Sequence, residues 1–228
     1  MSINILSINT STDGCSVAIM NYKNIIFDYF IISPYKHMKY ILNMIDRLLC
    51  KSKIKLKEIN IIAVSNGPGS FNGIRIGIGI AYGLSIVSNI PIIGISNLSI
   101  LAEGSWRKTG SCKVLTVIES KIGKFYWAKY ERKKNIWKLN KKEFFLNINK
   151  IENILINLKG FWAISGIGWK NIKLKYNNNL NIFSGKYIFP KAKDMIPIAF
   201  NKYIKNEYDY KSFIQPNYLN NKIFFKKK

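Results

Sequence analysis

Short apolar runs separated by polar turns open the chain and return near its middle. The first three runs cover residues 3–8, 15–20 and 25–32, and later runs cover residues 113–118, 125–130 and 136–146. Asn, Asp, Gly and Lys fill the turns between them. Such runs predict β-strands, and their close spacing predicts two antiparallel three-stranded meanders.

Residues 35–49 have helical spacing and follow Ser33 and Pro34, which predict the helix start. Its apolar residues gather on two adjacent sides and leave the polar ones less than half the circumference. A helix that covers one core needs a narrower apolar stripe. The excess predicts either a second helix packed on it, from a partner or a second copy, or deep burial between layers of its own chain.

Residues 74–81 alternate with period two, as in a strand, yet small residues also recur at spacing four. These are Gly73, Gly77 and Ala81, with Gly79 and Gly83 as a second series. The apolar stretch continues to Val87, too far for an average strand, so we predict a helix with two seams that admit another backbone. No charged residue occurs from 76 to 102. A buried helix followed by a buried strand explains this better than a membrane span.

Strands predicted at residues 59–65 and 90–95 alternate with these helices and indicate an α/β layer architecture. The apolar texture breaks at residues 106–111, and a meander follows. We therefore predict an internally duplicated fold with lobes at residues 1–106 and 107–228. The second lobe includes a predicted helix at 191–203 and a basic tail at 224–228.

Charge and cysteine content limit the binding partners and the cellular compartment that the sequence allows. The chain of 228 residues has 36 basic and 12 acidic side chains, a formal charge of +24, and is 48% hydrophobic. Only four of the basic residues are arginine. The charge fits a polyanion such as RNA, but the excess of Lys, Ile and Asn also fits A/T-biased coding, and both interpretations stay open. Three cysteines without a CxxC pair, and a start unlike a signal peptide, predict a reduced, cytoplasmic location and no membrane anchor.

Two loops are candidates for phosphate binding. The turn Asn9, Thr10 and Ser11 offers hydroxyl and backbone N–H groups, although it also fits an ordinary hairpin. The loop Gly67, Pro68, Gly69 and Ser70 precedes a helix N-terminus, although a tight turn with an N-cap at Ser70 explains the local sequence better. It is neither a Walker A motif nor a dinucleotide-binding fingerprint.

Metal and catalytic motifs are missing from the sequence. His37 is the only histidine, no His/Cys cluster has ligand spacing, and the acidic residues form no recognisable pair. We therefore predict no metal site and no catalytic residue.

The stretch from Asn66 to Gly77, NGPGSFNGIRIG, closely resembles the GPGSFTGVRIG motif of the bacterial TsaB (YeaZ-like) family. Similarity extends to ILSINTST at the start, SPYKH at the opening of the amphipathic helix, PIIGIS after it, YWA in the second half and PNYL near the end. The resemblance therefore covers nearly the whole chain.

This resemblance implies a duplicated actin-like or Hsp70-like ATPase fold, related to ribonuclease H, with two lobes that each hold a five-stranded mixed sheet. It implies a non-catalytic subunit that binds the catalytic TsaD and, through the complex, the ATPase TsaE and tRNA. The complex installs threonylcarbamoyl on N6 of adenosine 37 in tRNAs that read ANN codons. ATP or ADP would sit at the subunit interface, with degenerate phosphate loops at Asn9, Thr10, Ser11, Gly67, Gly69 and Ser70.

The resemblance also implies which residues dock TsaD. Whether two copies of the isolated chain pair through the same helix stays open. The docking residues lie on the helix that bears His37 and on the glycine-seamed helix: Tyr35, His37, Met38, Tyr40, Ile41, Met44, Ile45, Leu48, Gly73, Gly77 and Ala81. The metal-binding histidines of TsaD align with Asn97 and Leu101 here, and family aspartates align with Asn9 and Glu119. Those differences argue against metal binding and unaided ATP hydrolysis.

Three functions are compatible with the sequence. The favoured one is the scaffold and activating subunit. The second is an autonomous actin-fold ATPase or kinase, or a glycopeptidase-like hydrolase. The third is a basic RNA-binding module, which strong salt dependence without any protein partner would reveal.

Overall fold

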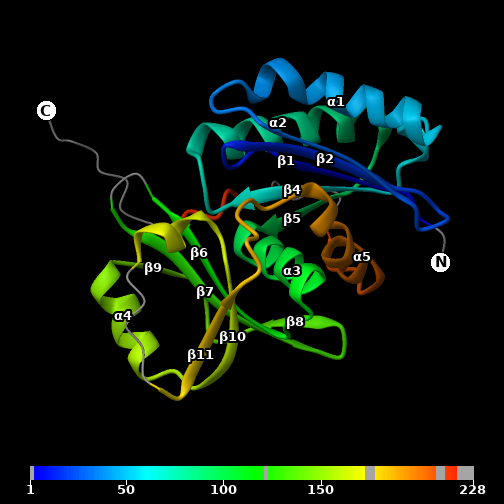
Figure 1. Cartoon of the computed structure of the whole chain (residues 1–228). Coiled ribbons are helices and arrows are strands. Elements are labelled where there is room, and N and C mark those ends of the chain that lie inside the picture. Colours follow the sequence, from blue (N-terminus) through cyan, green and yellow to red (C-terminus); the bar gives the residue numbers. More distant parts are fainter. Residues whose placement is uncertain (1–2, 121–122, 173–177, 209–213, 220–228) are drawn as a thin grey trace, which may run out of the picture.

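The fold is described from a computed structural model that covers residues 3–120, 123–172, 178–208 and 214–219. The predicted basic tail at 224–228 lies outside the described residues. The chain forms two mixed β-sheets, with helices on the outer face of each and between them (Figure 1).

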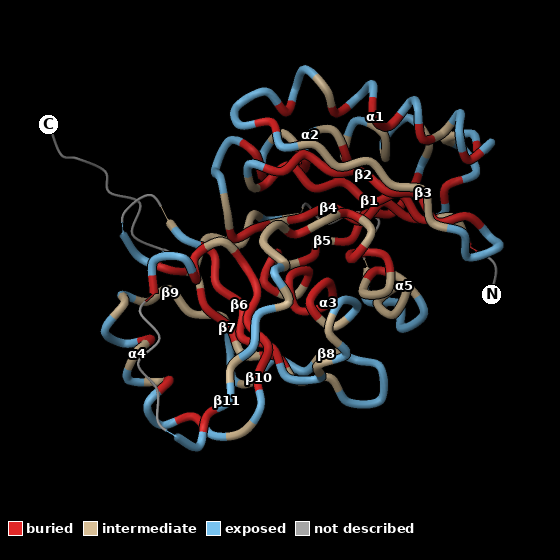
Figure 2. The backbone as a smooth tube through the Cα atoms, viewed as in Figure 1, coloured by how far each residue is buried: buried red, intermediate tan, exposed pale blue. Residues whose placement is uncertain are grey.

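The first sheet has the strand order β3-β2-β1-β4-β5. β1, β2 and β3 pair antiparallel, while β1, β4 and β5 run parallel. Its strands are β1 Ile5–Asn9, β2 Gly14–Met20, β3 Ile26–Ile32, β4 Ile61–Gly67 and β5 Ile92–Ser96. β1 and β2 are buried along their whole length, which explains why their apolar runs are nearly unbroken (Figure 2).

The second sheet repeats this topology with the order β11-β10-β6-β7-β8. β6, β7 and β8 are antiparallel, and β6, β10 and β11 are parallel. Its strands are β6 Lys113–Glu119, β7 Phe125–Lys133, β8 Ile136–Leu139, β9 Phe144–Leu146, β10 Gly160–Ser165 and β11 Leu180–Ser184. The predicted duplication is confirmed by the matching strand orders.

One strand prediction in the second lobe is wrong. The run at 136–146 is two strands, β8 and β9, which pair with opposite ends of β7, so this sheet has six strands where the resemblance implied five. The chain turns between them at Lys141, whose φ of 75° is left-handed.

The helices form three layers. α1 His37–Ser52 and α2 Phe71–Ser88 lie side by side on the outer face of the first sheet, and α4 Ile148–Ile156 covers the outer face of the second (Figure 1). α3 Asn97–Thr109 and α5 Ile196–Ile204 lie between the sheets. Short 3₁₀ turns occur at η1 Leu56–Glu58, η2 Ile167–Asn171 and η3 Ala192–Asp194.

The start predicted for α1 is wrong. Tyr35 has a left-handed φ of 60°, so the chain is not helical there, and Lys36 is the N-cap of a helix that begins at His37. The backbone N–H of Ser33 instead donates to the carbonyl of Asp13 (2.8 Å). Ser33 and Pro34 therefore end the β3 segment and do not begin the helix.

The helix predicted after Gly73 is confirmed as α2. The Ser70 side chain accepts a hydrogen bond from the N–H of Gly73 (3.4 Å), the arrangement of an N-cap. Among the described residues, α2 is the one helix whose length and composition would allow it to cross a membrane. It joins the adjacent parallel strands β4 and β5, and Ile74, Ile78 and Ala81 pack on their sheet.

The two halves are interlocked. The predicted boundary between residues 106 and 107 falls inside α3, a continuous helix. Leu98, Leu101 and Ala102 of α3 pack on the second sheet, whereas α5, late in the second half, packs on the first sheet through Ile196 and Ala199. A single cut in sequence therefore does not separate the two packed layers.

Candidate functional site

The two loops predicted to bind phosphate lie against each other. The N–H of Ser70 donates to the carbonyl oxygen of Ser11 (2.7 Å), and Thr10 Oγ1 donates to the carbonyl oxygen of Gly73 (2.7 Å). A Cβ atom on Gly69 would lie 2.1 Å from the Ser11 carbonyl oxygen. Gly69 is therefore needed for the close approach of these two backbone segments.

A buried and uncharged hydrogen-bond network joins the loops. Asn97 Nδ2 donates to the carbonyl of Pro68 (2.8 Å) and to Ser11 Oγ, while Asn9 Nδ2 donates to Asn97 Oδ1 (2.9 Å). Ser65 Oγ also donates to Asn97 Oδ1 (2.8 Å), and the N–H of Ser11 donates to Asn9 Oδ1 (3.0 Å). Satisfied neutral groups of this kind stabilise a unique arrangement of the loops.

This network corrects part of the predicted phosphate site. Asn9, Thr10 and Ser11 are each at most 1% exposed. Thr10 Oγ1 donates to the carbonyl oxygen of Gly73, Ser11 Oγ accepts from Asn97 Nδ2, and Asn9 Oδ1 accepts from Ser11 within the same turn. Gly67 is buried too, and its N–H points to Ser65 Oγ (3.3 Å). Asn9, Thr10, Ser11 and Gly67 therefore do not fit a nucleotide phosphate, because they are buried and their polar groups are engaged within the protein. Gly69 is half-buried and Ser70 is exposed, so their phosphate role stays a prediction.

The predicted docking residues of α1 divide into an inner and an outer set. His37, Ile41, Met44, Ile45 and Leu48 are buried, and the four apolar ones belong to the core on the first sheet. These side chains lie on the inner side of α1 and not on its surface, so their assignment to a docking surface is corrected. Deep burial was the alternative that the pattern had left open.

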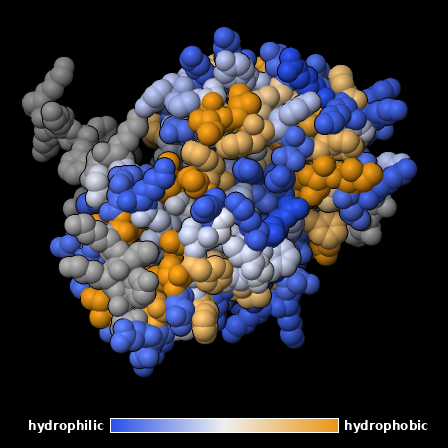
Figure 3. Space-filling view, in the orientation of Figure 1, coloured by the Kyte–Doolittle hydropathy of each residue, from blue (hydrophilic) through white to orange (hydrophobic). Residues whose placement is uncertain are grey.

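The outer set of α1 is on the surface. Tyr35 is 86% exposed and Met38 74%, while Tyr40 is half-buried. Leu42, one turn after Met38, is 57% exposed. Beside them, Ile31, Ile32, Pro34 and Tyr40 line an open hollow at the end of β3. Figure 3 shows apolar side chains gathered along the front of this upper half, where β3 runs.

The small residues of α2 that were predicted to dock a partner lie on the inner side of the helix. A Cβ atom on Gly73 would lie 2.1 Å from the carbonyl oxygen of Thr10, and one on Gly77 would lie 2.7 Å from Thr10 Oγ1. Ala81 is fully buried in the same core. Gly73, Gly77 and Ala81 therefore bring α2 close to the first strand-turn of its own sheet, and their assignment to a partner interface is corrected.

The second seam on α2 is open. A Cβ on Gly79 or Gly83 would meet nothing within 4 Å, and Ile86 and Val87 on the same side are 79% and 82% exposed. Gly79 and Gly83 were visible in the sequence as a second series at spacing four. The pattern did not show which seam points outward, because both series alternate along one almost wholly apolar helix.

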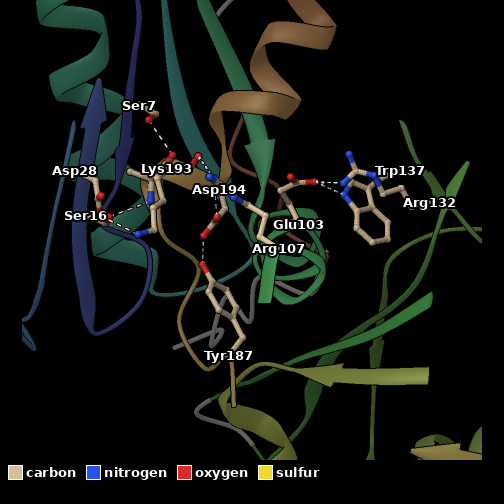
Figure 4. Close-up of polar contacts among 11 residues, drawn as sticks. Ser7, Ser16, Asp28, Glu103, Arg107, Arg132, Trp137, Tyr187, Lys193 and Asp194 are labelled. Carbon is tan, nitrogen blue, oxygen red and sulfur yellow. Dashed lines mark hydrogen bonds and ion pairs between the residues drawn. The ribbon is translucent and has the colours of Figure 1, made fainter. Parts of the chain in front are cut away.

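The lobes are joined by buried ion pairs between α3, η3 and the second sheet (Figure 4). Asp194 is 1% exposed, receives Arg107 Nη1 (3.2 Å) and accepts a hydrogen bond from the Tyr187 hydroxyl. Glu103 is 2% exposed and accepts from Arg132 Nη1 (3.1 Å) and Trp137 Nε1 (2.7 Å). Burial raises the pKa of both carboxyl groups, and the cationic partners oppose that shift.

Relatives of the chain agree with this architecture. It is 44% identical over 203 residues, 89% of this chain and 95% of the other, to the "tRNA threonylcarbamoyladenosine biosynthesis protein TsaB" of Buchnera aphidicola subsp. Schizaphis graminum. The Escherichia coli protein of that name is 37% identical over 98% of this chain and 97% of its own length. The chain belongs to the TsaB family.

Solved structures extend the match to three dimensions. "YeaZ from Pseudomonas aeruginosa" superposes with a TM-score of 0.82 at 25% identity and covers 93% of this chain and 98% of its own. Residues 32–212 also match the family described as "TsaD: tRNA N6-adenosine threonylcarbamoyltransferase". Together with the two matching sheets, these findings show the duplicated actin-like ATPase fold.

The positions that align with the TsaD histidines have structural roles in this TsaB-family chain. Asn97 is the centre of the loop network, and Leu101 is fully buried against the second sheet. Glu119 is exposed and accepts a hydrogen bond from Asn171 Nδ2 (2.7 Å). Among the residues that the structure describes, no three His, Cys, Asp or Glu side chains lie where they could hold a metal ion.

His37 has a consequence for stability that can be measured. It is 5% exposed with Nδ1 unpartnered, and burial lowers its pKa, an effect that Asp13 and the Thr12 backbone partly offset. The folded state therefore binds the proton less well than the unfolded state, and stability is lost as pH falls through about 6.5. Because this is the chain's only histidine, His37→Leu should flatten the pH dependence of the urea midpoint between about pH 7 and 5.5. An unchanged slope would contradict this.

Proposed function

We propose that this chain is a non-catalytic subunit in tRNA threonylcarbamoyladenosine biosynthesis, which docks and activates a TsaD-type transferase. The observation that carries the proposal is the apolar outer face of α2, here named the α2 outer face and defined by Gly79, Gly83, Ile86 and Val87. Two open glycines flanked by exposed aliphatic residues fit the close approach of a partner helix.

The outer set of α1 extends this surface. Met38 and Leu42 lie one turn apart and are both more than half exposed. α1 and α2 rest on one sheet, so a partner that presented two helices of its own would bury both outer faces in a four-helix layer. Exposed apolar surface of this extent on two neighbouring helices supports a protein partner.

The closed loops support the non-catalytic part of the proposal. Asn9, Ser11, Ser65 and Asn97 form an uncharged network with no carboxylate to organise a magnesium ion around a nucleotide. ATP or ADP would then bind at the junction with the partner or on the ATPase TsaE, which joins the assembly together with tRNA. In the absence of TsaD, the same two helices would pair two copies of the chain. The proposal places the chain in the cytoplasm.

Ile86→Asp tests the docking surface. Ile86 is 79% exposed, so its replacement should leave the free energy of unfolding within about 0.5 kcal/mol. A buried carboxylate at the centre of an interface should weaken TsaD binding about thirtyfold or more. Co-purification and titration calorimetry with the TsaD of the same organism would measure the effect.

Ile156→Asp is the matched control. Ile156 is an exposed isoleucine on a helix of the other lobe, α4, and is 48% exposed. It should bind TsaD as the unchanged chain does. Full binding by Ile86→Asp, or equal loss in both variants, would remove the assignment of the docking surface. Sustained ATP hydrolysis by the isolated chain would favour an autonomous enzyme.

A further inference from the structure

We infer that the outer edge of the second sheet binds the phosphate backbone of RNA. The choice of tRNA as that RNA rests on the proposed function. The edge is here named the basic edge. It is defined by six exposed lysines on β7, on β8 and in the connections next to these strands: Lys124, Lys133, Lys134, Lys138, Lys141 and Lys142.

Charge is concentrated at this edge. Residues 124–145 contain eight basic and two acidic residues, so about a tenth of the chain carries more than a fifth of its 36 basic side chains. RNA attracts such a surface through its phosphates, whose counterions are released on binding.

The two acidic residues of the segment differ in their surroundings. Glu143 accepts hydrogen bonds from the hydroxyl of Tyr130 (2.7 Å), from Ser96 and from Asn217 Nδ2 (2.9 Å), all on the inner side. Glu131 is half-buried and lies between Lys113 and Lys138 in the strand register. Glu131 therefore offsets part of the charge at Lys138, and the charge of the other five lysines is left for an external anion.

Aromatic side chains are interleaved with the lysines. Lys124 Nζ lies 5.4 Å from the ring centre of Phe145, and Lys142 Nζ lies 5.6 Å from that of Phe144. Both rings are half-buried. Contacts of this kind hold the flexible ammonium groups along the strand edge and reduce the entropy lost when they bind phosphate.

The position of the basic edge leaves it open in the proposed complex. β8 lies on the opposite half of the molecule from α1 and α2 (Figure 1). Figure 3 shows hydrophilic side chains projecting at the lower right, where the β7–β8 hairpin lies in Figure 1. A transferase on the first lobe and RNA on the second lobe can therefore be bound at the same time. Another lysine-rich segment, residues 51–57, spans the end of α1 and η1 on the docking lobe.

Two lysines of the basic edge allow a test that does not damage the fold. Lys134 and Lys141 have left-handed φ values of 48° and 75°, which glycine adopts without steric penalty. The double variant K134G/K141G removes two charges and should stay as stable as the parent. The matched control is K53G/K186G, since Lys53 and Lys186 are exposed, have φ values of 57° and 52°, and lie away from this edge.

Fluorescence anisotropy would measure the affinity for an unmodified tRNA transcript with adenosine at position 37. The titration is repeated over a salt series, both with the chain alone and with TsaD bound. K134G/K141G should weaken binding roughly tenfold at about 0.1 M salt and lower the log–log salt slope by about one per lysine. K53G/K186G should leave both near the parent values. Equal losses in the two double variants, or no salt-dependent binding in either form of the parent, would overturn the inference.

The outcome is separable from that of the proposed function. K134G/K141G should keep full TsaD binding, whereas Ile86→Asp should lose it and keep the RNA affinity of the isolated chain. If Ile86→Asp bound TsaD normally while K134G/K141G still lost RNA, the docking surface would be wrong and the basic edge would stand.

Discussion

Gly73→Ala is expected to destabilise the protein by about 3 kcal/mol, although it adds a single methyl group. The added Cβ would lie 2.1 Å from the carbonyl oxygen of Thr10 and 3.2 Å from the carbonyl carbon. Backbone atoms of a buried turn cannot move aside as a flexible side chain does. α2 would have to shift away from β1, which breaks the hydrogen bond from Thr10 Oγ1 to the Gly73 carbonyl.

Gly79→Ala on the same helix is the matched control. A Cβ there meets nothing within 4 Å, so only helix propensity changes, and alanine should stabilise the fold by about 0.5 to 1 kcal/mol. Urea unfolding of both variants would measure the difference. Equal free energies of unfolding for the two variants would show that Gly73 has no packing role.

The architecture was predictable because local patterns carry it. Strand runs bounded by turn residues placed most of the strands, and the repeated meander led to the duplicated fold. The stretch from residue 74 to 81 could be assigned to a helix only from the length of the apolar run, because its period-two alternation favoured a strand. The Lys141 turn was missed because a lysine at a left-handed φ carries no turn signal in sequence.

The functional surface was harder to predict because it depends on which side of a helix the rest of the chain covers. α1 has apolar residues on two adjacent sides, and only the structure shows that Ile41 and Leu48 face the sheet while Met38 and Leu42 face outward. The return of α5 to the first sheet is also a long-range contact without a local signature. Likewise, the meeting of Asn9 with Asn97, 88 residues away, could not be predicted from either loop alone.

Arg132→Met is expected to destabilise the protein by about 3 to 5 kcal/mol, the effect of leaving a buried charge without its partner. The guanidinium of Arg132 lies 3.1 Å from Glu103 Oε2 and 3.3 Å from the ring centre of Trp106, and its side chain is 9% exposed. Methionine preserves much of the packing but leaves Glu103 with Trp137 Nε1 as its remaining donor. Because α3 carries Glu103 and β7 carries Arg132, the loss loosens the contact between α3 and the second sheet.

The sign of the pH dependence follows from Glu103. Burial raises the folded-state pKa of this carboxyl above its ordinary value, so the unfolded chain ionises first as pH rises. Stability is therefore lost as pH rises above about 4.5, and Arg132→Met should enlarge that loss because the cation that opposes the shift is gone. Glu103→Gln in the Arg132→Met background should restore part of the stability and remove the added pH dependence. Urea unfolding of the two single variants and the double variant between about pH 5 and 8 would measure both effects. A double variant no more stable than Arg132→Met would show that packing on Trp106, and not the buried charge, sets the loss.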